Sequence, residues 1–235
     1  LLPPPSGGES AAVAGQAAPG LAAAAGDASE EAAGEAAVKA EFPGATIIRP
    51  SVVFGPEDKF FNLFAGLARF TMFMPAFGCP VMPVLKWFKD GKVLQMDFYG
   101  DGGTKFQPVY VGDVADAILA ALANKSAKGK TYELGGPKVY SSIEIMNLML
   151  ENIGRKRILV PIPLWYLAIV GWFLQKIPVP LLTYDQVMLL KVDNVVSKKA
   201  KKLSDLSVNA TPAAAILPSY LARFRKVGHG AETSP

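Results

Sequence analysis

The sequence predicts an α/β protein, on the basis of two observations. The run at residues 45–48 is apolar and mostly β-branched, and a strand that is apolar on both faces is typical of a parallel sheet covered by helices on both sides. Two further short segments, at residues 109–111 and 131–134, also predict strands and are separated from it and from each other by segments with helical apolar spacing. Strands and helices therefore alternate along the chain.

The composition excludes several classes of site. The chain has 235 residues and a formal net charge of +4. Its single cysteine, Cys79, rules out a disulfide framework and any cysteine-based metal site. Its single histidine, His229, lies in a polar tail, which argues against a histidine-centred triad or zinc site. The basic run at residues 197–202 has no interleaved aromatic residue, so we interpret it as a solvated face and expect no nucleic-acid partner.

The N-terminal segment differs in composition from the rest. Residues 1–28 are nearly all Ala, Gly and Pro, which predicts a disordered leader. This leader contains no Arg or Lys, so it does not have the features of a mitochondrial presequence. From Ser29 the residues are good helix formers with acidic side chains in the first turn, and Pro43 and Gly44 are expected to end that helix.

The strand at residues 45–48 ends at Arg49 and Pro50, and a second apolar run at residues 52–54 breaks at Gly55 and Pro56. In parallel sheets, ligands bind in the crevice beyond the carboxyl ends of the strands. The sequence therefore predicts that residues 50–54 lie at the mouth of a binding cleft.

Residues 58–73 predict an aromatic-rich amphipathic helix. Six apolar side chains on it could line a substrate pocket, but such a stripe is more often plain core, and we prefer that interpretation. These side chains are Phe60, Phe61, Phe64, Leu67, Ala68 and Phe73. The following residues, 74–103, are rich in Pro and Gly and predict an irregular insertion.

The pattern becomes regular again after this insertion. The strand at residues 109–111 leads to a helix that Asp113 is placed to cap. Val114, Ile118 and Leu122 should share one face of that helix. Another strand is expected at residues 131–134. Residues 141–144 have the spacing of a capping box and open a helix that Gly154 should end.

Residues 158–182 are the most apolar part of the chain. Pro161 and Pro163 interrupt the beginning of this stretch, so its helix should start near Leu164 and be too short to span a bilayer. Four aromatic side chains suit a helix docked on a partner or at a membrane surface. They are Trp165, Tyr166, Trp172 and Phe173.

Two segments in this order carry a family resemblance: ATIIRPSVVFGPEDKFFN (residues 45–62) and FQPVYVGDVADAI (residues 106–118). They resemble the atypical short-chain dehydrogenase/reductase family, and residues 158–197 are similar to its members among the accessory subunits of mitochondrial respiratory complex I. The resemblance implies the C-terminal part of a Rossmann-like NAD(P)-binding fold with a small helical substrate-type domain. We expect a leader at residues 1–28, a partial nucleotide-binding domain at residues 29–135 with an insertion near 74–103, a helical domain at residues 136–226 and a tail at residues 227–235.

The same resemblance implies a function. It predicts a non-catalytic complex I subunit on the matrix side of the mitochondrial inner membrane, in contact with other complex I subunits. It also implies NADP(H) as a structural cofactor. The residues matching the part of the family that meets the nicotinamide end, by backbone and apolar contacts, are Pro50, Ser51, Val52 and Val53.

Two family features are absent from this sequence. No strand, glycine-rich turn and helix precede Ala45, so the element that holds a pyrophosphate is missing. The positions aligned with the family's catalytic Tyr-x-x-x-Lys hold Asp27 and Glu31, and an acid cannot replace that lysine. We therefore expect no catalysis and no measurable dinucleotide binding by this chain alone. Two alternatives stay open: an NAD(P)-dependent epimerase or reductase whose catalytic half lies upstream, and a membrane-associated binding protein anchored through residues 164–174.

Overall fold

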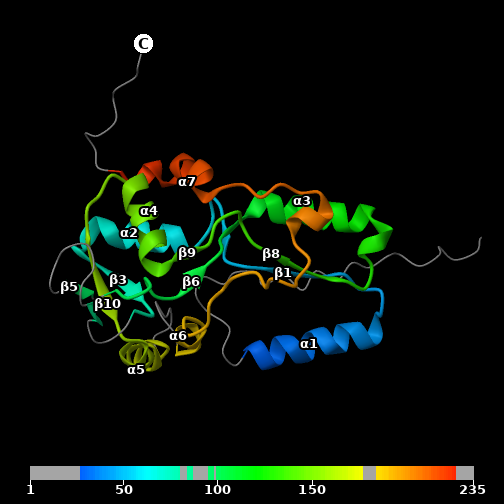
Figure 1. Ribbon diagram of the computed structural model, residues 1–235, viewed down its shortest axis with the longest axis horizontal. Coiled ribbons are helices and arrows are strands. Elements are labelled where there is room, and N and C mark those ends of the chain that lie inside the picture. Colours follow the sequence, from blue (N-terminus) through cyan, green and yellow to red (C-terminus); the bar gives the residue numbers. More distant parts are fainter. Residues whose placement is uncertain (1–26, 80–83, 87–94, 98, 177–183, 226–235) are drawn as a thin grey trace, which may run out of the picture.

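The computed structural model of the chain describes residues 27–79, 84–86, 95–97, 99–176 and 184–225 (Figure 1). The predicted disordered leader lies outside the described residues except for Asp27 and Ala28, which begin the first helix. The predicted C-terminal tail also lies outside them.

Helices and short strands alternate along the described chain, as an α/β fold requires. The helices are α1 (Asp27–Glu41), α2 (Phe60–Phe70), α3 (Val111–Ala123), α4 (Ser142–Asn152), α5 (Leu164–Leu174), α6 (Tyr184–Leu189) and α7 (Ala213–Leu221). The strands are β1 (Ile47–Pro50), β2 (Val53–Phe54), β3 (Phe73–Phe77), β4 (Val84–Lys86), β5 (Gln95–Asp97), β6 (Lys105–Phe106), β7 (Val109–Tyr110), β8 (Thr131–Leu134), β9 (Tyr140–Ser141) and β10 (Ile158–Ile162).

Three strand pairs are parallel: β1 with β8, β2 with β7, and β3 with β10. Two are antiparallel, β4 with β5 and β6 with β9. In the first pair Ile47 lies opposite Thr131 and Pro50 opposite Leu134. Ile47 and Ile48 are both buried although they point to opposite faces of the strand, which confirms the prediction of a strand covered on both sides.

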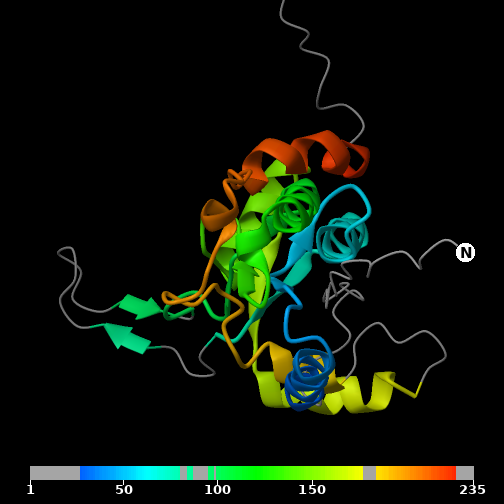
Figure 2. The same cartoon turned by 90° about the vertical axis from the view of Figure 1, so that its right-hand side faces the viewer.

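Helices lie on both sides of the strand layer (Figures 1 and 2). On one side are α2, α4, α7 and α3, and on the other are α5, α6 and α1, so the strands form the middle of three layers. Because parallel pairs dominate and helices cover both faces, the α/β prediction is confirmed.

Two groups of buried side chains form the core. The larger lies where α2, α4 and α7 meet β3 and includes Phe61, Met149 and Leu217. The smaller lies between α3 and the β1–β8 pair and includes Ile48 and Leu134. The predicted aromatic stripe is therefore mainly core, as preferred. Phe60, Phe61, Phe64 and Ala68 of α2 are buried, whereas Leu67 is exposed. Phe73 is also exposed and lies in β3, outside the helix to which it was assigned.

The predicted cap of α3 is wrong. The helix begins at Val111, so Asp113 lies inside its first turn instead of before it. The Asp113 carboxylate instead accepts hydrogen bonds from the Thr211 backbone N–H at 2.6 Å and from the Thr211 hydroxyl at 2.7 Å. The expected apolar face is also partly wrong, since Leu122 is 52% exposed and the small side chain of Ala117 is buried in the core.

The segment expected to be irregular contains regular structure. The helix α2 ends at Phe70, and β3 follows at once and pairs with β10, which had been expected only as the proline-broken start of an apolar run. Pro75 and Pro161 lie in these strands. Among the described strands each of the two pairs with the other alone, so one edge of each strand makes no ladder hydrogen bonds. A proline, which has no N–H, is tolerated at such an edge. The strands β4 and β5 form an antiparallel pair within the same segment, while residues 80–83, 87–94 and 98 lie outside the described part.

The local signals later in the chain are confirmed. The strand β8 covers the expected residues, and both bonds of the capping box between Ser141 and Glu144 are formed at the start of α4. Gly154 follows the end of α4 with a left-handed φ of 63°. The helix α5 begins at Leu164 as predicted. Among the described residues, no helix is both long and apolar enough to cross a bilayer.

Candidate functional site at the carboxyl ends of β1 and β8

The loop predicted to meet a ligand begins where β1 ends. Pro50 is the last residue of β1, Ser51 and Val52 follow, and Val53 opens β2. The Ser51 backbone N–H donates to the Leu134 carbonyl at 2.8 Å, so the loop stays aligned with the end of β8. Because β1 and β8 are parallel, both carboxyl ends lie at the same edge of the sheet, where ligands of such folds bind.

The side chains of this loop are already engaged with the protein. Ser51 is 8% exposed, and its hydroxyl oxygen lies 2.7 Å from Asn194 Oδ1 and 3.0 Å from the Asn194 carbonyl oxygen. Pro50 is buried, and Val52 and Val53 are half-buried. The loop therefore offers backbone and apolar surface to a ligand, while its one hydroxyl group holds Asn194.

Two residues at this edge were missed by sequence reasoning, Gln107 and Asn194. Gln107 Nε2 donates to the Gly136 carbonyl at 2.8 Å, and its Oε1 accepts from the Val196 N–H at 2.9 Å. The Gln107 backbone N–H donates to the Asn194 carbonyl at 3.0 Å. Isolated amide side chains carry no recognisable spacing, so no sequence signal pointed to them.

The close packing around Gln107 explains the glycine pair that follows β8. A Cβ atom at Gly135 would lie 2.7 Å from Gln107 Cδ, and one at Gly136 would overlap the Pro108 carbonyl oxygen. Glycine is therefore required at both positions by close approach of the backbone. In the sequence, this glycine pair indicated only the end of a strand.

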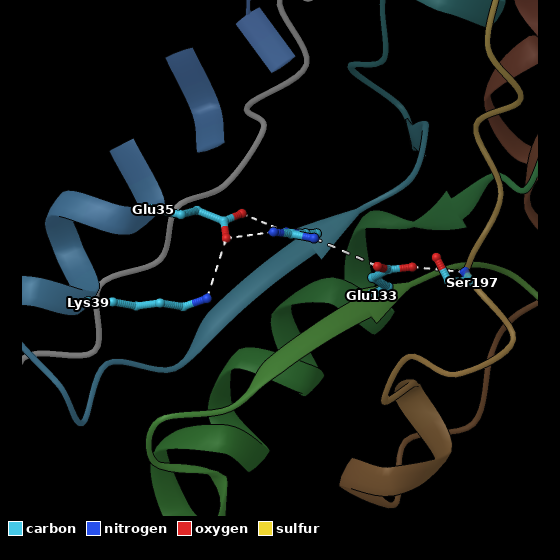
Figure 3. Close-up of polar contacts among 5 residues, drawn as sticks. Glu35, Lys39, Glu133 and Ser197 are labelled. Atoms are coloured by element: carbon cyan, nitrogen blue, oxygen red, sulfur yellow. Dashed lines mark hydrogen bonds and ion pairs between the residues drawn. The ribbon is translucent and has the colours of Figure 1, made fainter. Parts of the chain in front are cut away.

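Arg49 connects β1 to α1, and Figure 3 shows the surrounding residues Glu35, Lys39, Glu133 and Ser197. The Nε and Nη2 of Arg49 donate to the two carboxylate oxygens of Glu35 at 2.5 and 2.6 Å, a bidentate pair, and its Nη1 lies 3.8 Å from Glu133 Oε1. Glu133 Oε2 in turn accepts from the Ser197 N–H at 2.8 Å. The hydrogen bond from Arg49 lowers the pKa of Glu35 below its ordinary value. Lys39, one turn along α1, lies 3.8 Å from the same carboxylate.

The polar side chains that meet at this edge do not form an acid–base pair. Ser51, Gln107 and Asn194 are a hydroxyl and two amides, and they bridge chain segments. The family positions for the catalytic tyrosine and lysine fall on α1 at Asp27 and Glu31. In the part of the chain that the structure describes, no group of three or more side chains could hold a metal ion.

A dinucleotide needs a helix start that accepts phosphate, and the described helices that follow strands do not provide one. A carboxylate lies at the start of α2 (Asp58), of α3 (Asp113) and of α4 (Glu144), and α5 begins after Pro163, which has no N–H. A negative charge at these positions repels phosphate. At α2 the Asp58 carboxylate also occupies the Phe61 N–H, and at α4 the Glu144 carboxylate occupies the Ser141 N–H. The described residues therefore do not fit the pyrophosphate of NADP(H), and only the loop at residues 50–53 remains as a wall for one end of the cofactor.

The chain is similar to several known proteins. Residues 28–135 match the NAD dependent epimerase/dehydratase family. The chain is 35% identical over 208 residues to the NADH dehydrogenase [ubiquinone] 1 alpha subcomplex subunit 9, mitochondrial, of Arabidopsis thaliana, which covers 84% of this chain and 46% of that protein. The protein of the same name in Mus musculus is 32% identical, covering 77% of this chain and 43% of that protein.

A solved structure supports the fold alone. A nucleoside-diphosphate-sugar epimerase from Staphylococcus aureus superposes with a TM-score of 0.50 at 13% identity, over 81% of this chain and 56% of that one. The chain thus spans about half the length of the curated relatives it matches. Along most of its length the chain is similar to the subunit 9 proteins of mitochondrial NADH dehydrogenase, and its residues 28–135 match the NAD dependent epimerase/dehydratase family.

Proposed function

We propose that this chain acts as a non-catalytic accessory subunit of mitochondrial respiratory complex I, on the matrix side of the inner membrane. The observation that carries the proposal is the similarity to subunit 9 of Arabidopsis thaliana, which extends over 84% of the chain and includes the segments after the epimerase match. The chemistry at the carboxyl ends of β1 and β8 supports a structural role, because the side chains there tie segments together.

The proposed cofactor role is limited to one loop. Pro50, Ser51, Val52 and Val53 would form the wall against the nicotinamide end of NADP(H), through backbone and apolar contacts. Because the described helix starts carry carboxylates or proline, we expect this chain alone to bind neither NADPH nor NADH measurably. Isothermal titration calorimetry of the full chain tests this, and micromolar binding would show that the fit to the pyrophosphate has been misjudged.

The proposed contact with the complex is α5. Four of its aromatic side chains are exposed, with Trp165 at 60% and Phe173 at 61%, together with Tyr166 and Trp172. A group of apolar side chains this large on one short helix marks an interaction surface. We propose that it contacts another complex I subunit at the inner membrane surface, with the aromatic rings at the interface between protein and lipid.

The experiment is incorporation of the tagged full chain into complex I, followed by blue native electrophoresis of mitochondria from the organism that makes it. The tagged chain should migrate with the complex, and the double substitution Trp172→Ala, Phe173→Ala should release it. Leu119→Ala, which removes an equally exposed side chain from α3, is the matched control and should leave migration unchanged. A chain that migrates apart from the complex would overturn the proposed function. Undiminished incorporation of the double variant would overturn the role of α5.

A further inference from the structure

An apolar groove lies between α2, the β3–β10 pair and α5, apart from the edge of the sheet described above. Its volume is about 620 Å³, within the range of ligand sites in proteins. All the residues that line it are apolar: Leu63, Phe64, Leu67, Phe73, Met74, Pro75, Phe77, Val160, Ile162 and Leu167.

The alternation of side chains along the strands creates this groove. In β10, Leu159 is buried in the core, whereas Val160 and Ile162 are only half-buried and line the groove. In β3, Phe73 is exposed and lies opposite Ile158. The groove is thus the outer face of a two-stranded sheet that the flanking helices cover incompletely.

Buried and exposed side chains divide the groove into a floor and a rim. Phe64 and Phe77 are buried and form the floor, while Leu63, Leu67 and Phe73 are exposed and form the rim. A polar ligand group in this groove would lose its hydrogen bonds with water without a replacement from the lining side chains. The part of a ligand that enters it must therefore be hydrocarbon.

Three cationic residues are close along the chain to residues that line the groove. Arg157 directly precedes β10, and its Nε donates to the carbonyl of Ala68, the residue after the rim residue Leu67. Lys156 is exposed beside it, and Arg69 is exposed in the last turn of α2. A hydrocarbon site with cations close to it is complementary to an amphiphile with a negative head group.

We propose that the groove binds an acyl chain of an anionic phospholipid, with the phosphate near Arg69, Lys156 and Arg157. This site differs from the aromatic surface of α5, which would contact the outside of a membrane or a partner. The groove would take a single chain into the protein. It goes beyond the proposed accessory role and does not require incorporation into complex I.

The test uses phosphatidylglycerol carrying a diazirine at the end of one acyl chain, mixed into phosphatidylcholine vesicles and photolysed with the purified full chain. Peptide mass spectrometry should find the label on α2, β3 and β10. Val160→Phe should fill the groove, and Leu67→Trp should close its rim from an exposed position that tolerates a larger side chain. Each should reduce this labelling about tenfold, because excluding about two methylene groups of the acyl chain from the groove lowers its affinity by about that factor. Leu119→Trp, on α3, is the control and should label normally.

The charge is tested separately. Lys156→Glu should lower labelling by phosphatidylglycerol severalfold, while Lys125→Glu, an exposed lysine after α3, should not. Circular dichroism spectra of all variants must match that of the parent chain. Label found only on α5, or groove labelling unaffected by both Val160→Phe and Leu67→Trp, would overturn the proposal. Equal groove labelling by a phosphatidylcholine probe, unaffected by Lys156→Glu, would overturn the assignment to an anionic lipid.

Discussion

The two sides of the molecule are stabilised in different ways. The helical side (α2, α4, α7 and β3) contains the larger core, in which Phe61, Met149 and Leu217 are almost completely buried. The sheet side (β1, β8, α3 and α1) contains the smaller core, where β1 pairs with β8 alone among the described strands. No residue of α1 between positions 33 and 41 is buried.

The sheet side, with its smaller core, is also joined by polar contacts between distant segments. Asp113 binds Thr211, Ser51 binds Asn194, and Arg49 binds Glu35. The helical side holds the apolar groove and leads into α5, so the surfaces proposed for binding lie on or beside the densely packed part. The edge proposed to meet one end of a cofactor lies on the sheet side.

The largest expected effect tests the helical side. Phe61→Ala should lower the free energy of unfolding by about 3–5 kcal/mol, since a large aromatic side chain is lost from a closed core. Ile48→Ala, on the sheet side, should lower the free energy of unfolding by about 2 kcal/mol. This is the low end of the range for truncating a buried isoleucine to alanine, because β1 has a partner strand on one edge only. Urea denaturation followed by circular dichroism measures both. A larger loss for Ile48→Ala than for Phe61→Ala would reverse the comparison.

The next largest effect tests a contact between the two sides. Asp113 is 5% exposed and its carboxylate accepts two hydrogen bonds from Thr211, so Asp113→Ala should cost about 2–3 kcal/mol. Asp116→Ala, an exposed acid on the same helix, should change the free energy of unfolding by less than about 0.5 kcal/mol. A double-mutant cycle with Thr211→Val isolates the bond to the hydroxyl. If Asp113→Ala and Asp116→Ala lowered the free energy of unfolding equally, the contact between Asp113 and Thr211 would not stabilise the fold.

The sequence predicted those elements whose signals are local. The strand β8, the capping box of α4 and the start of α5 at Leu164 each depend on a few neighbouring residues. The position of the loop after β1 followed from the general rule for parallel sheets, although its contact with a dinucleotide stays a prediction.

The features that the sequence did not predict are long-range. The pair β3–β10 joins residues about eighty positions apart, and Pro75 and Pro161 within it suggest irregular structure until the pairing is known. Ser51 and Asn194 are 143 positions apart, and no periodicity connects a serine to an asparagine at that distance. The role of Asp113 was missed because α3 starts three residues earlier than a cap at that position requires.

A smaller effect is expected from the start of α4. Ser141→Ala removes one bond of the capping box and should cost about 1 kcal/mol. Hydrogen exchange should accelerate at the Glu144 amide, whose N–H donates to the Ser141 hydroxyl, and remain slow at Met149, deep in the larger core. Ser219→Ala, at an exposed hydroxyl of α7, is the control. Faster exchange throughout α4 would show that the helical side depends on this polar contact more than its packing suggests.

The smallest effect concerns α1 and its dependence on pH. Because Arg49 lowers the pKa of Glu35 below 4.5, the ion pair contributes stability above that value and loses it as the pH falls through the lowered pKa of the folded state. Asp58, at the start of α2, behaves oppositely: burial raises its pKa above 3.8, so its contribution is complete below 3.8 and is lost as the pH rises through the raised value. Acidification below pH 4 should therefore loosen α1 while α2 stays folded, which hydrogen exchange mass spectrometry can resolve.

Glu35→Gln tests the ion pair directly. At neutral pH it should loosen α1 by no more than about 1 kcal/mol, because the pair is exposed, and it should abolish the pH dependence of α1. Glu41→Gln, exposed at the end of the same helix, is the control and should have neither effect. Loss of α2 before α1 on acidification would contradict the assignment of the weaker attachment to the sheet side.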